Sequence, residues 1–544
     1  MGYYYRDFVD GIKAFTPQER RNIALYITGI MLYKFGLEAF NGSITALLTN
    51  RYDYEAAQSS SSTTRTLQQI GLAQGLNQAF QCVGSILIAP LIKRYPTKNV
   101  LSCAIVVFGV FTAIILVMDA ATGGTFIPDS YRGVNHPKNE YSYYGDYVTD
   151  GIIPVWSICG VAYGMVELIR RVIPRDIVGG NVQKLRKMDA IVHIFYEVSG
   201  TVSAFVTALV LIPQLGNNRS FIITPILFCC AGIVWYFISE LGFKREIGRV
   251  LEERPAIIRA IFSGFWLFGE SIVVGAKIIF SSRRFIWLLP SYGVALYAHR
   301  YLENGIATQV AKRYLGEAGW SQIIVGGSNL GELFGALFVF LFTNVVQTPI
   351  PWLRLDALML LVIWYIPYWY PPSGDVGQAW KAAATLIPVS MGWAAGDVSL
   401  AAYIQAALGR RESTSRRVSA LGAVMAFLYS FYVVTYAIAG TLLGLYLDSV
   451  YDSTGGNENG GDIHSGLVFT AGVQFTIISV LILISTFIPE GALALNPKTL
   501  YREDLDDDYH DNEFTLVKSN TDKAMVDAGE CHDGIRVRTP EVVY

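Results

Sequence analysis

Two charged side chains, Lys34 and Glu38, stand four residues apart in the first long apolar stretch of this sequence. Residues at this spacing share one face of an α-helix and can pair. Inside a lipid bilayer each charge costs about 2.5–3.5 kcal/mol on insertion scales, so it needs a counterion, water or a change of protonation. We predict that the pair lines a polar cavity and opens to a proton or a substrate, or else is a static ion pair that stabilises packing.

Two further stretches combine histidine with carboxylates. His193 precedes Glu197 by four residues, and His299 and Arg300 are followed by Glu303. A histidine beside a carboxylate can titrate near neutral pH, so the first pair is predicted to relay protons, the alternative being a static hydrogen bond. Arg300 and Glu303 are predicted to contact the substrate, unless Arg300 only neutralises Glu303.

Isolated acids complete the predicted site. Asp397 and Glu332 lie within apolar stretches and are predicted to take part in proton coupling. Glu167 lies three residues before Arg170, which predicts a gating pair or, alternatively, a salt bridge at the membrane surface. The predicted residues are Lys34, Glu38, Asn41, Arg300 and Glu303 for substrate binding, His193, Glu197, Asp397 and Glu332 for proton coupling, and Glu167, Arg170 and Arg94 for gating.

The stretches that carry these residues have the length of membrane-spanning helices. Of the 544 residues, 52% are hydrophobic and only 16% are charged, against about 25% charged in soluble domains. This pattern predicts an all-α polytopic membrane protein with twelve transmembrane helices in two pseudo-symmetric six-helix halves. The predicted helices lie near 22–48, 68–92, 100–118, 152–171, 190–212, 220–240, 286–308, 320–344, 353–370, 379–405, 418–446 and 466–488.

Lysine and arginine are concentrated in alternate connectors, which predicts that those connectors and both termini are cytoplasmic. An apolar segment at 256–280 carries three charges, and we predict an interfacial amphipathic helix rather than a thirteenth span. The predicted parts are an N-terminal segment (1–21), a first half (22–240), a connector (241–285), a second half (286–490) and an acidic, disordered cytoplasmic tail (491–544).

The two halves show an internal repeat. Asn41-Gly42 precedes Arg51-Tyr52 in the first half, and Asn304-Gly305 precedes Arg313-Tyr314 in the second. Two GxxxG patterns, at 160–164 and 392–396, are each followed closely by an acid. Parallel repeats of this kind place a binding site at the axis between them.

With twelve spans, a six-plus-six division and a long central connector, residues 20–490 resemble the major facilitator superfamily of secondary transporters and are similar to fungal members. Segment 89–98 is a degenerate form of the family's motif between the second and third helices. The family usually has glycine at the position of Ala89, an acid at that of Lys93 and glycine at that of Pro96, so the motif's charge-relay role is not carried over to Lys93. The resemblance implies alternating access between the two halves.

The sequence contains 42 basic and 44 acidic residues, which gives no support to a nucleic-acid partner. Phosphate-loop, HExxH, CxxC and GxSxG patterns are missing, so we predict no enzyme, no cofactor and no metal site. The predicted function is secondary transport of a small organic solute, with possible proton coupling, by a monomer in the plasma membrane or a vacuolar or other internal membrane. The alternatives are a transporter-like receptor and a membrane-embedded enzyme.

Overall fold

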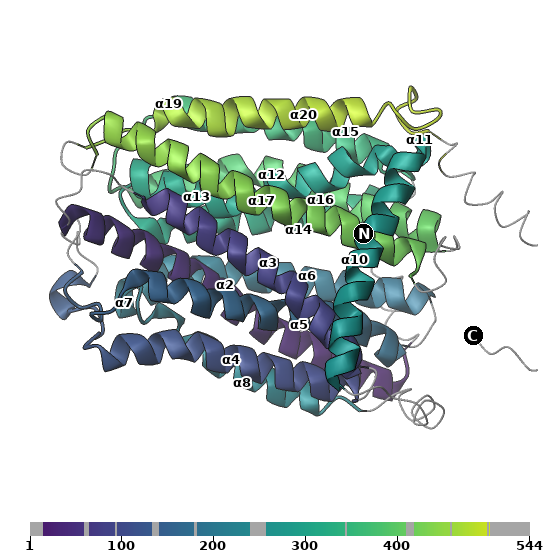
Figure 1. The fold of residues 1–544 in the computed structure, drawn as a ribbon, viewed down its shortest axis with the longest axis horizontal. Helices are drawn as coiled ribbons and strands as arrows, with labels where there is room; N and C mark the ends of the chain where they lie inside the picture. Colours follow the sequence, from purple (N-terminus) through teal and green to yellow (C-terminus); the bar gives the residue numbers. More distant parts are fainter. Residues whose placement is uncertain are drawn as a thin grey trace, which may run out of the picture.

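The computed structural model describes residues 15–58, 65–92, 95–132, 141–178, 182–239, 257–342, 345–409, 418–456, 460–497 and 500. The regular structure of this described part is helical throughout, and most of the helices run side by side (Figure 1). All twelve segments predicted from the sequence are largely helical here, which confirms the predicted fold class, whereas the number of membrane spans stays a prediction.

The first half consists of six helical stretches linked by short connections. Their bounds are α2 Pro17–Gln58, α3 Thr66–Ile92, α4 Thr97–Ala121, α5 Ile152–Val178, α6 Val182–Val206 with η3 Thr207–Leu211 and α7 Ile212–Leu215, and η4 Ser220–Ile222 with α8 Ile223–Tyr236. Two short turns, η1 Asp129–Tyr131 and η2 Thr149–Gly151, lie between α4 and α5.

The second half repeats this plan with more interruptions. Its seventh stretch comprises α11 Arg283–Ile286, η5 Leu289–Val294, α12 Ala295–Tyr301, η6 Leu302–Ile306, α13 Ala307–Gln309 and η7 Val310–Tyr314. Then follow η8 Ala318–Trp320, α14 Ser321–Phe342, α15 Ile350–Met359, η9 Leu360–Tyr368, α16 Val376–Gly409, α17 Ala420–Ser453, α19 His464–Leu467, η10 Val468–Val473 and α20 Gln474–Ser485.

Each half has its own apolar core. One cluster of buried residues is drawn from residues 15–238, and the other comes almost entirely from residues 279–500. The halves meet where α3 packs on α17 and α6 packs on α14. In Figure 1 the first half lies below and the second above, with α3 and α17 adjacent. A site between the halves is therefore lined by helices from both.

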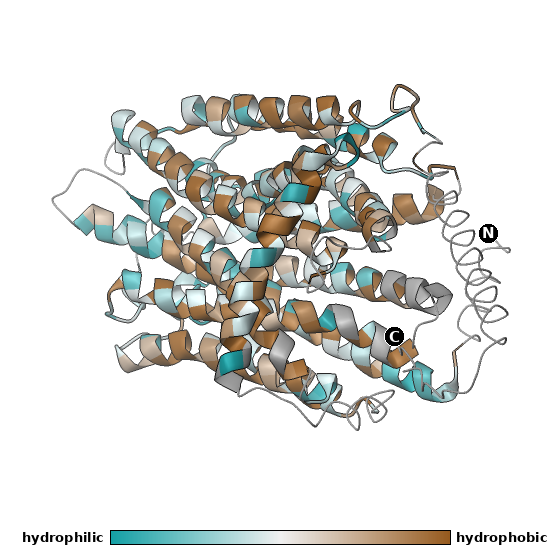
Figure 2. Cartoon of the chain, turned by 45° about the vertical axis from the view of Figure 1, so that its right-hand side comes forward, coloured by the Kyte–Doolittle hydropathy of each residue, from teal (hydrophilic) through white to brown (hydrophobic). Residues whose placement is uncertain are grey.

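Nine helices among the described residues are long and apolar enough to cross a membrane. Eight coincide with predicted spans, and the ninth, Ile261–Ser281, belongs to α10 Ile257–Ser281 in the connector. Only 6% of the residues in its most apolar stretch are buried. Helix α10 runs steeply across the bundle and packs against α3 and α17 (Figures 1 and 2). The colouring in Figure 2 shows many hydrophobic residues along α10 and the outer helices. Large apolar side chains of α10, such as Phe262 and Trp266, are exposed. The interfacial position of α10 in a bilayer stays a prediction.

Close helix packing explains the first GxxxG pattern. Gly160 and Gly164 of α5 face the backbone of α3, where an added Cβ would overlap the carbonyl oxygens of Asn77 and Gln81. Glycine pairs at this spacing allow backbones to approach closely. In the second half, a Cβ on Gly392 would lie 2.9 Å from the Cα of Asp356. These glycines set the distances between the helices that carry the polar residues.

We expect Gly164→Ala to lower the melting temperature of the purified protein. The added methyl group meets the α3 backbone, and overpacking of this kind costs about 1–3 kcal/mol. The matched control is Gly269→Ala on α10, where a Cβ meets no atom within 4 Å. Equal melting temperatures for the two variants in the same detergent would contradict this account of the α3–α5 contact.

Candidate functional site

His299 joins two carboxylates in the interior of the second half. Its Nε2 lies 2.7 Å from Glu332 Oε1 and 3.5 Å from Glu303 Oε1. The imidazole is 1% exposed and stacks on Trp393 of α16, with ring centroids 5.1 Å apart and planes at 16°. The ring is thereby held at the end of α12, facing the π-helical segment η6 and α14. Such π-helical turns occur frequently at functional sites.

Glu303 is held from both sides. Arg300 Nη1 donates a hydrogen bond of 2.8 Å to one carboxylate oxygen, and Ser328 Oγ donates one of 2.9 Å to the other. Ser328 is also 2.7 Å from Ser390 Oγ, which links α14 to α16. The Arg300 side chain is 39% exposed, while that of Glu303 is only 7% exposed. Arg300 is therefore the member of this group most accessible to a solute.

The first half contributes the Lys34–Glu38 pair, which forms a buried ion pair and hydrogen bond as its spacing predicted. The ammonium group lies 4.6 Å from the centroid of the Tyr196 ring, at cation–π distance. The lysine stem runs against Gly200 of α6, where a Cβ would overlap it. A glycine at 200 therefore gives the lysine its path between α2 and α6.

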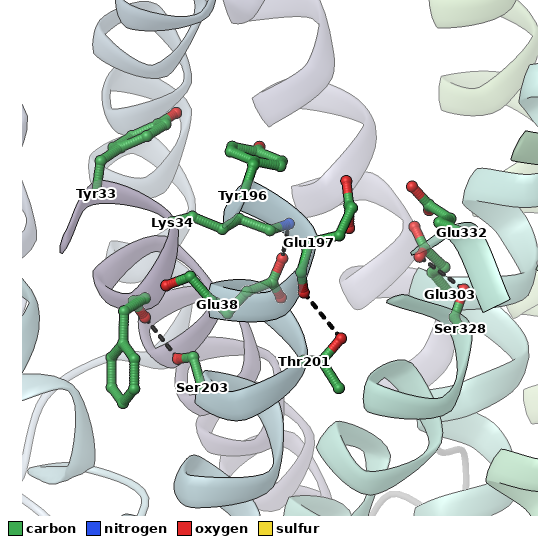
Figure 3. Close-up of polar contacts among 12 residues, drawn as sticks. Tyr33, Lys34, Glu38, Tyr196, Glu197, Thr201, Ser203, Glu303, Ser328 and Glu332 are labelled. Carbon is green, nitrogen blue, oxygen red and sulfur yellow. Dashed lines mark hydrogen bonds and ion pairs between the residues drawn. The ribbon is translucent and has the colours of Figure 1, made fainter. Parts of the chain in front are cut away.

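Glu197 lies between these two groups (Figure 3). It is 3% exposed, and its Oε2 atom has no hydrogen-bond partner within the described parts of the chain. Among charged side chains Glu332 acts on it most strongly, followed by Lys34, Glu38 and Glu303. Figure 3 shows the Glu197 side chain extending from α6 toward Glu332. A carboxylate of the first half thus faces the carboxylates of the second.

The predicted gating pair forms, and it connects to the same cluster. Arg170 Nε donates a hydrogen bond of 2.6 Å to Glu167 Oε2, and the Tyr33 hydroxyl donates one of 2.9 Å to Oε1. The Arg170 guanidinium lies 4.4 Å from the centroid of the Tyr196 ring, the ring that also faces Lys34. Glu167 and Arg170 thus form an ion pair, as their spacing allows, while both a gating role and a place at the membrane surface stay predictions.

The remaining predicted residues are Asn41, His193, Asp397 and Arg94. Asn41 is exposed on α2. His193 is half-buried, its Nε2 is unpartnered, and no hydrogen bond joins it to Glu197 within the described residues. Asp397 is half-buried on α16, where its charge acts on Asp356 of α15. Arg94 lies outside the described residues. Roles for all four stay predictions.

An ion pair that the sequence did not single out joins the two halves at one end of the bundle. Arg313 of η7 donates hydrogen bonds of 2.8 and 2.9 Å from its two terminal nitrogens to the two carboxylate oxygens of Asp53 on α2. Thr66 Oγ1 donates to the same carboxylate at 2.6 Å, and Lys312 Nζ lies 3.6 Å away. We call these four residues the clasp. Paired hydrogen bonds of this kind are among the strongest that charged side chains make.

A second contact between the halves lies beside the clasp. Asp448 of α17 accepts hydrogen bonds from the backbone N–H groups of Leu67 and Gln68, at 3.1 and 2.9 Å. A carboxylate there satisfies free donors of the first turn of α3 and complements the helix dipole. The clasp and Asp448 together join the halves at this end.

The repeat carried a signal for the clasp that sequence reasoning left unused. Arg51, the counterpart of Arg313, donates to Thr149 Oγ1 at 2.9 Å and to the Gly145 carbonyl at 3.0 Å, within its own half. Its guanidinium lies 3.7 Å from the centroid of the Tyr147 ring. Two arginines at equivalent positions therefore have different partners, and only the one in the second half crosses the interface.

The chain folds into two helical halves that pack through α3–α17 and α6–α14 around a buried polar cluster. Solved structures of membrane transporters have the same fold. The proton:xylose symporter XylE of E. coli, a member of the major facilitator superfamily, matches with a TM-score of 0.53 and 13% identity, over 88% of this chain and 98% of that structure. The chain thus has the major facilitator fold.

Other transporters give the same result. The peptide transporter POT, in complex with sulfate, matches with a TM-score of 0.54 at 12% identity, over 88% of this chain and 96% of that structure. The nucleoside transporter NupG matches with a TM-score of 0.51 at 12% identity, over 86% and 99% of the two chains. No protein-family model and no curated protein sequence matches the chain. The similarity to fungal members stays a prediction.

We expect Asp53→Asn to destabilise the protein by about 3–5 kcal/mol, because it leaves Arg313 buried without its counterion. Thermal unfolding in detergent measures the effect. In the double variant Asp53→Asn with Arg313→Gln, most of the stability should return. The control is Asp129→Asn, whose partner Arg132 is exposed, and exposed pairs contribute about 0–1 kcal/mol. A loss at Asp53 no larger than that of the control would contradict the clasp.

Proposed function

We propose that this protein is a secondary active transporter that moves a small organic solute across a membrane by alternating access, coupled to protons. The observation that carries the proposal is the buried charge cluster shared between the halves, with Lys34, Glu38 and Glu197 on one side and His299, Glu303 and Glu332 on the other. Transporters built from two repeats bind substrate at such an interface. The XylE, NupG and POT structures are support at the level of fold.

In this proposal, the solute binds between Arg300 and the Lys34–Glu38 pair, with Glu303 as the counter-charge and Asn41 as a further contact. Arg300 is suited to this role because it is the most exposed charge of the group. Protons occupy the Glu197 and Glu332 side, with His193 and Asp397 as further carriers. A charged group of the solute competes for one partner of an ion pair. The carboxylate released from the pair can then take up a proton. The Lys34–Glu38 and Arg300–Glu303 pairs neutralise their own charges, and in this proposal bound protons compensate the remaining carboxylates.

The orientation follows from the distribution of lysine and arginine, which favours cytoplasmic termini. The clasp lies near the end of α2 that is remote from the N-terminus, so in this proposal it seals the non-cytoplasmic side. The site then opens toward the cytoplasm, where Glu167, Arg170 and Arg94 form the second gate. The protein works as a monomer in the plasma membrane or in a vacuolar or other internal membrane. Charged groups from both halves favour this reading over a membrane enzyme with a fixed site near one face.

A thermal-stability screen of the purified protein identifies the solute. Sugars, nucleosides, dipeptides and organic acids are tested at about pH 5.5 and 7.5, because a ligand that binds only the folded state raises the melting temperature. A pH-dependent hit that also enters liposomes containing the protein supports coupled transport. A solute that binds but does not enter liposomes, whichever way the protein is inserted, would favour a receptor over a transporter.

We expect Glu303→Gln to abolish flux of the solute found in that screen and to keep the melting temperature near that of the unchanged protein. Glutamine can still accept the Ser328 hydrogen bond but provides no charge for Arg300. Liposome uptake under an imposed pH gradient is the measurement. Asp146→Asn, in an exposed connection, is the control and should transport normally. Normal flux in Glu303→Gln would remove this residue from the mechanism.

A further inference from the structure

The cluster between the halves carries more acid than base. Lys34 neutralises Glu38, and the remaining carboxylates of Glu197, Glu303 and Glu332 meet one guanidinium, that of Arg300. With His299 neutral and every one of these acids ionised, two negative charges remain uncompensated. Charges in an apolar interior must be paired, bind a metal or be neutralised. The cluster therefore requires two positive charges.

The donor atoms fit a metal ion. His299 Nε2 and carboxylate oxygens of Glu303 and Glu332 all lie within 4.8 Å of one another. Bonds from Zn²⁺ to imidazole nitrogen and carboxylate oxygen measure about 2.0–2.2 Å, so the donors around one tetrahedral ion lie about 3.4 Å apart. Side-chain rotations of the glutamates close that difference. One imidazole with carboxylates suits divalent transition metals such as Zn²⁺ and Mn²⁺ better than Mg²⁺ or Ca²⁺.

A fourth donor comes from the opposite half. The Glu197 Oε2 atom is buried and unpartnered within the described residues. The side chain as a whole extends toward Glu332 (Figure 3). The hydrogen bonds of Ser328 and Arg300 orient Glu303, and Trp393 orients the His299 ring. Outer partners of this kind hold the ligands in metal sites. The arrangement is thus more than a group of neighbouring acids.

We propose that His299, Glu303, Glu332 and Glu197 form a binding site for one divalent transition-metal ion, which replaces two protons. Without metal, the charge balance of the cluster requires two bound protons. When the ion binds, both protons leave to the solvent, and the total charge of the site is unchanged. Metal ligands must be deprotonated, so affinity and proton release are linked.

Other titratable or charged groups surround the site from the adjacent helices, and they keep their state in this exchange. They are Lys34 and Glu38 of α2, His193 and Tyr196 of α6, Arg300 of α12 and Asp356 of α15. Asp356 is 1% exposed, and its Oδ1 has no hydrogen-bond partner among the residues that the structure describes, so we count it as a neutral acid. His193 is likewise counted as neutral, because its removal from water disfavours an imidazolium and the fields of Arg170 and Lys34 oppose that of Glu332.

If the proposed transport function also holds, this exchange gives it a coupling rule. The ligands come from both halves, so the bound ion connects them, and two arriving protons release it. One ion would then cross against two protons without net charge movement. The binding site itself does not depend on that step, because it needs only the geometry of the four side chains.

The test uses the purified full-length chain and Zn²⁺, Mn²⁺ and Co²⁺ as probes. Isothermal titration in two buffers of different ionisation enthalpy counts the protons released for each ion. We expect one high-affinity ion per chain, release of two protons, and affinity that falls up to 100-fold for each unit of decreasing pH in the acidic range. Bound Co²⁺ should show the visible absorption of nitrogen and oxygen ligation.

Variants assign the site. His299→Gln should remove the high-affinity ion, and Glu332→Gln should lower affinity at least 10-fold, with melting temperatures measured without metal as the folding check. Glu197→Gln should still bind the ion, more weakly, and release one proton instead of two. The control is His464→Gln, which removes a histidine–aspartate pair elsewhere on the second half and should leave the titration unchanged.

Three results would overturn the site: absence of a high-affinity ion, an ion retained in His299→Gln, or two protons released by Glu197→Gln. If the metal site fails while a pH-dependent solute flux persists, the transporter stands and the metal does not. If an ion binds with release of two protons but neither it nor any solute enters liposomes, the site stands and the transporter does not.

Discussion

Compensation of charge in an apolar interior is the constraint on which the rest of this structure depends. Every ionised side chain deep in the bundle must meet an opposite charge or carry a proton, because an isolated charge there costs several kcal/mol. The Lys34–Glu38 pair satisfies this requirement within one helix, and Arg300–Glu303 does so at the junction of α12 and η6. The carboxylates of Glu197 and Glu332 lack a fixed arginine or lysine partner of their own, and we propose that protons or a metal ion compensate them.

The two halves have the same order of helices but differ in how they place their charged residues. The first half places its Lys–Glu pair in one continuous helix, whereas the second holds its polar residues on a helix interrupted by π turns. Arg51 stays within its own half, but its counterpart Arg313 reaches across to Asp53. Equivalent residues of the two halves therefore have different partners, and only the second half extends an arginine across the interface.

Local patterns in the sequence predicted what depends on local structure. Apolar stretches predicted the helices, and the spacing of Lys34 and Glu38 predicted their contact. The contacts of His299 with Glu332 and of Arg313 with Asp53 span 33 and 260 residues, so no local spacing encodes them. They depend on how helices pack. The same reason explains why motif searches found no set of metal donors, since those donors lie on different helices.

The interrupted seventh stretch carries residues of both the charge cluster and the clasp. Glu303 stands in η6 and Arg313 in η7, about 15 Å apart along the same helix at 1.5 Å per residue. A π turn holds one residue more than an α turn, so it is a local dislocation in the winding. If that dislocation moves by one turn, the residues that it passes change the face that they present to neighbouring helices, while the chain beyond keeps its orientation. A shift of η6 or η7 would therefore reorient the side chains that it passes, Glu303 or Arg313 among them, without a bend in the helix.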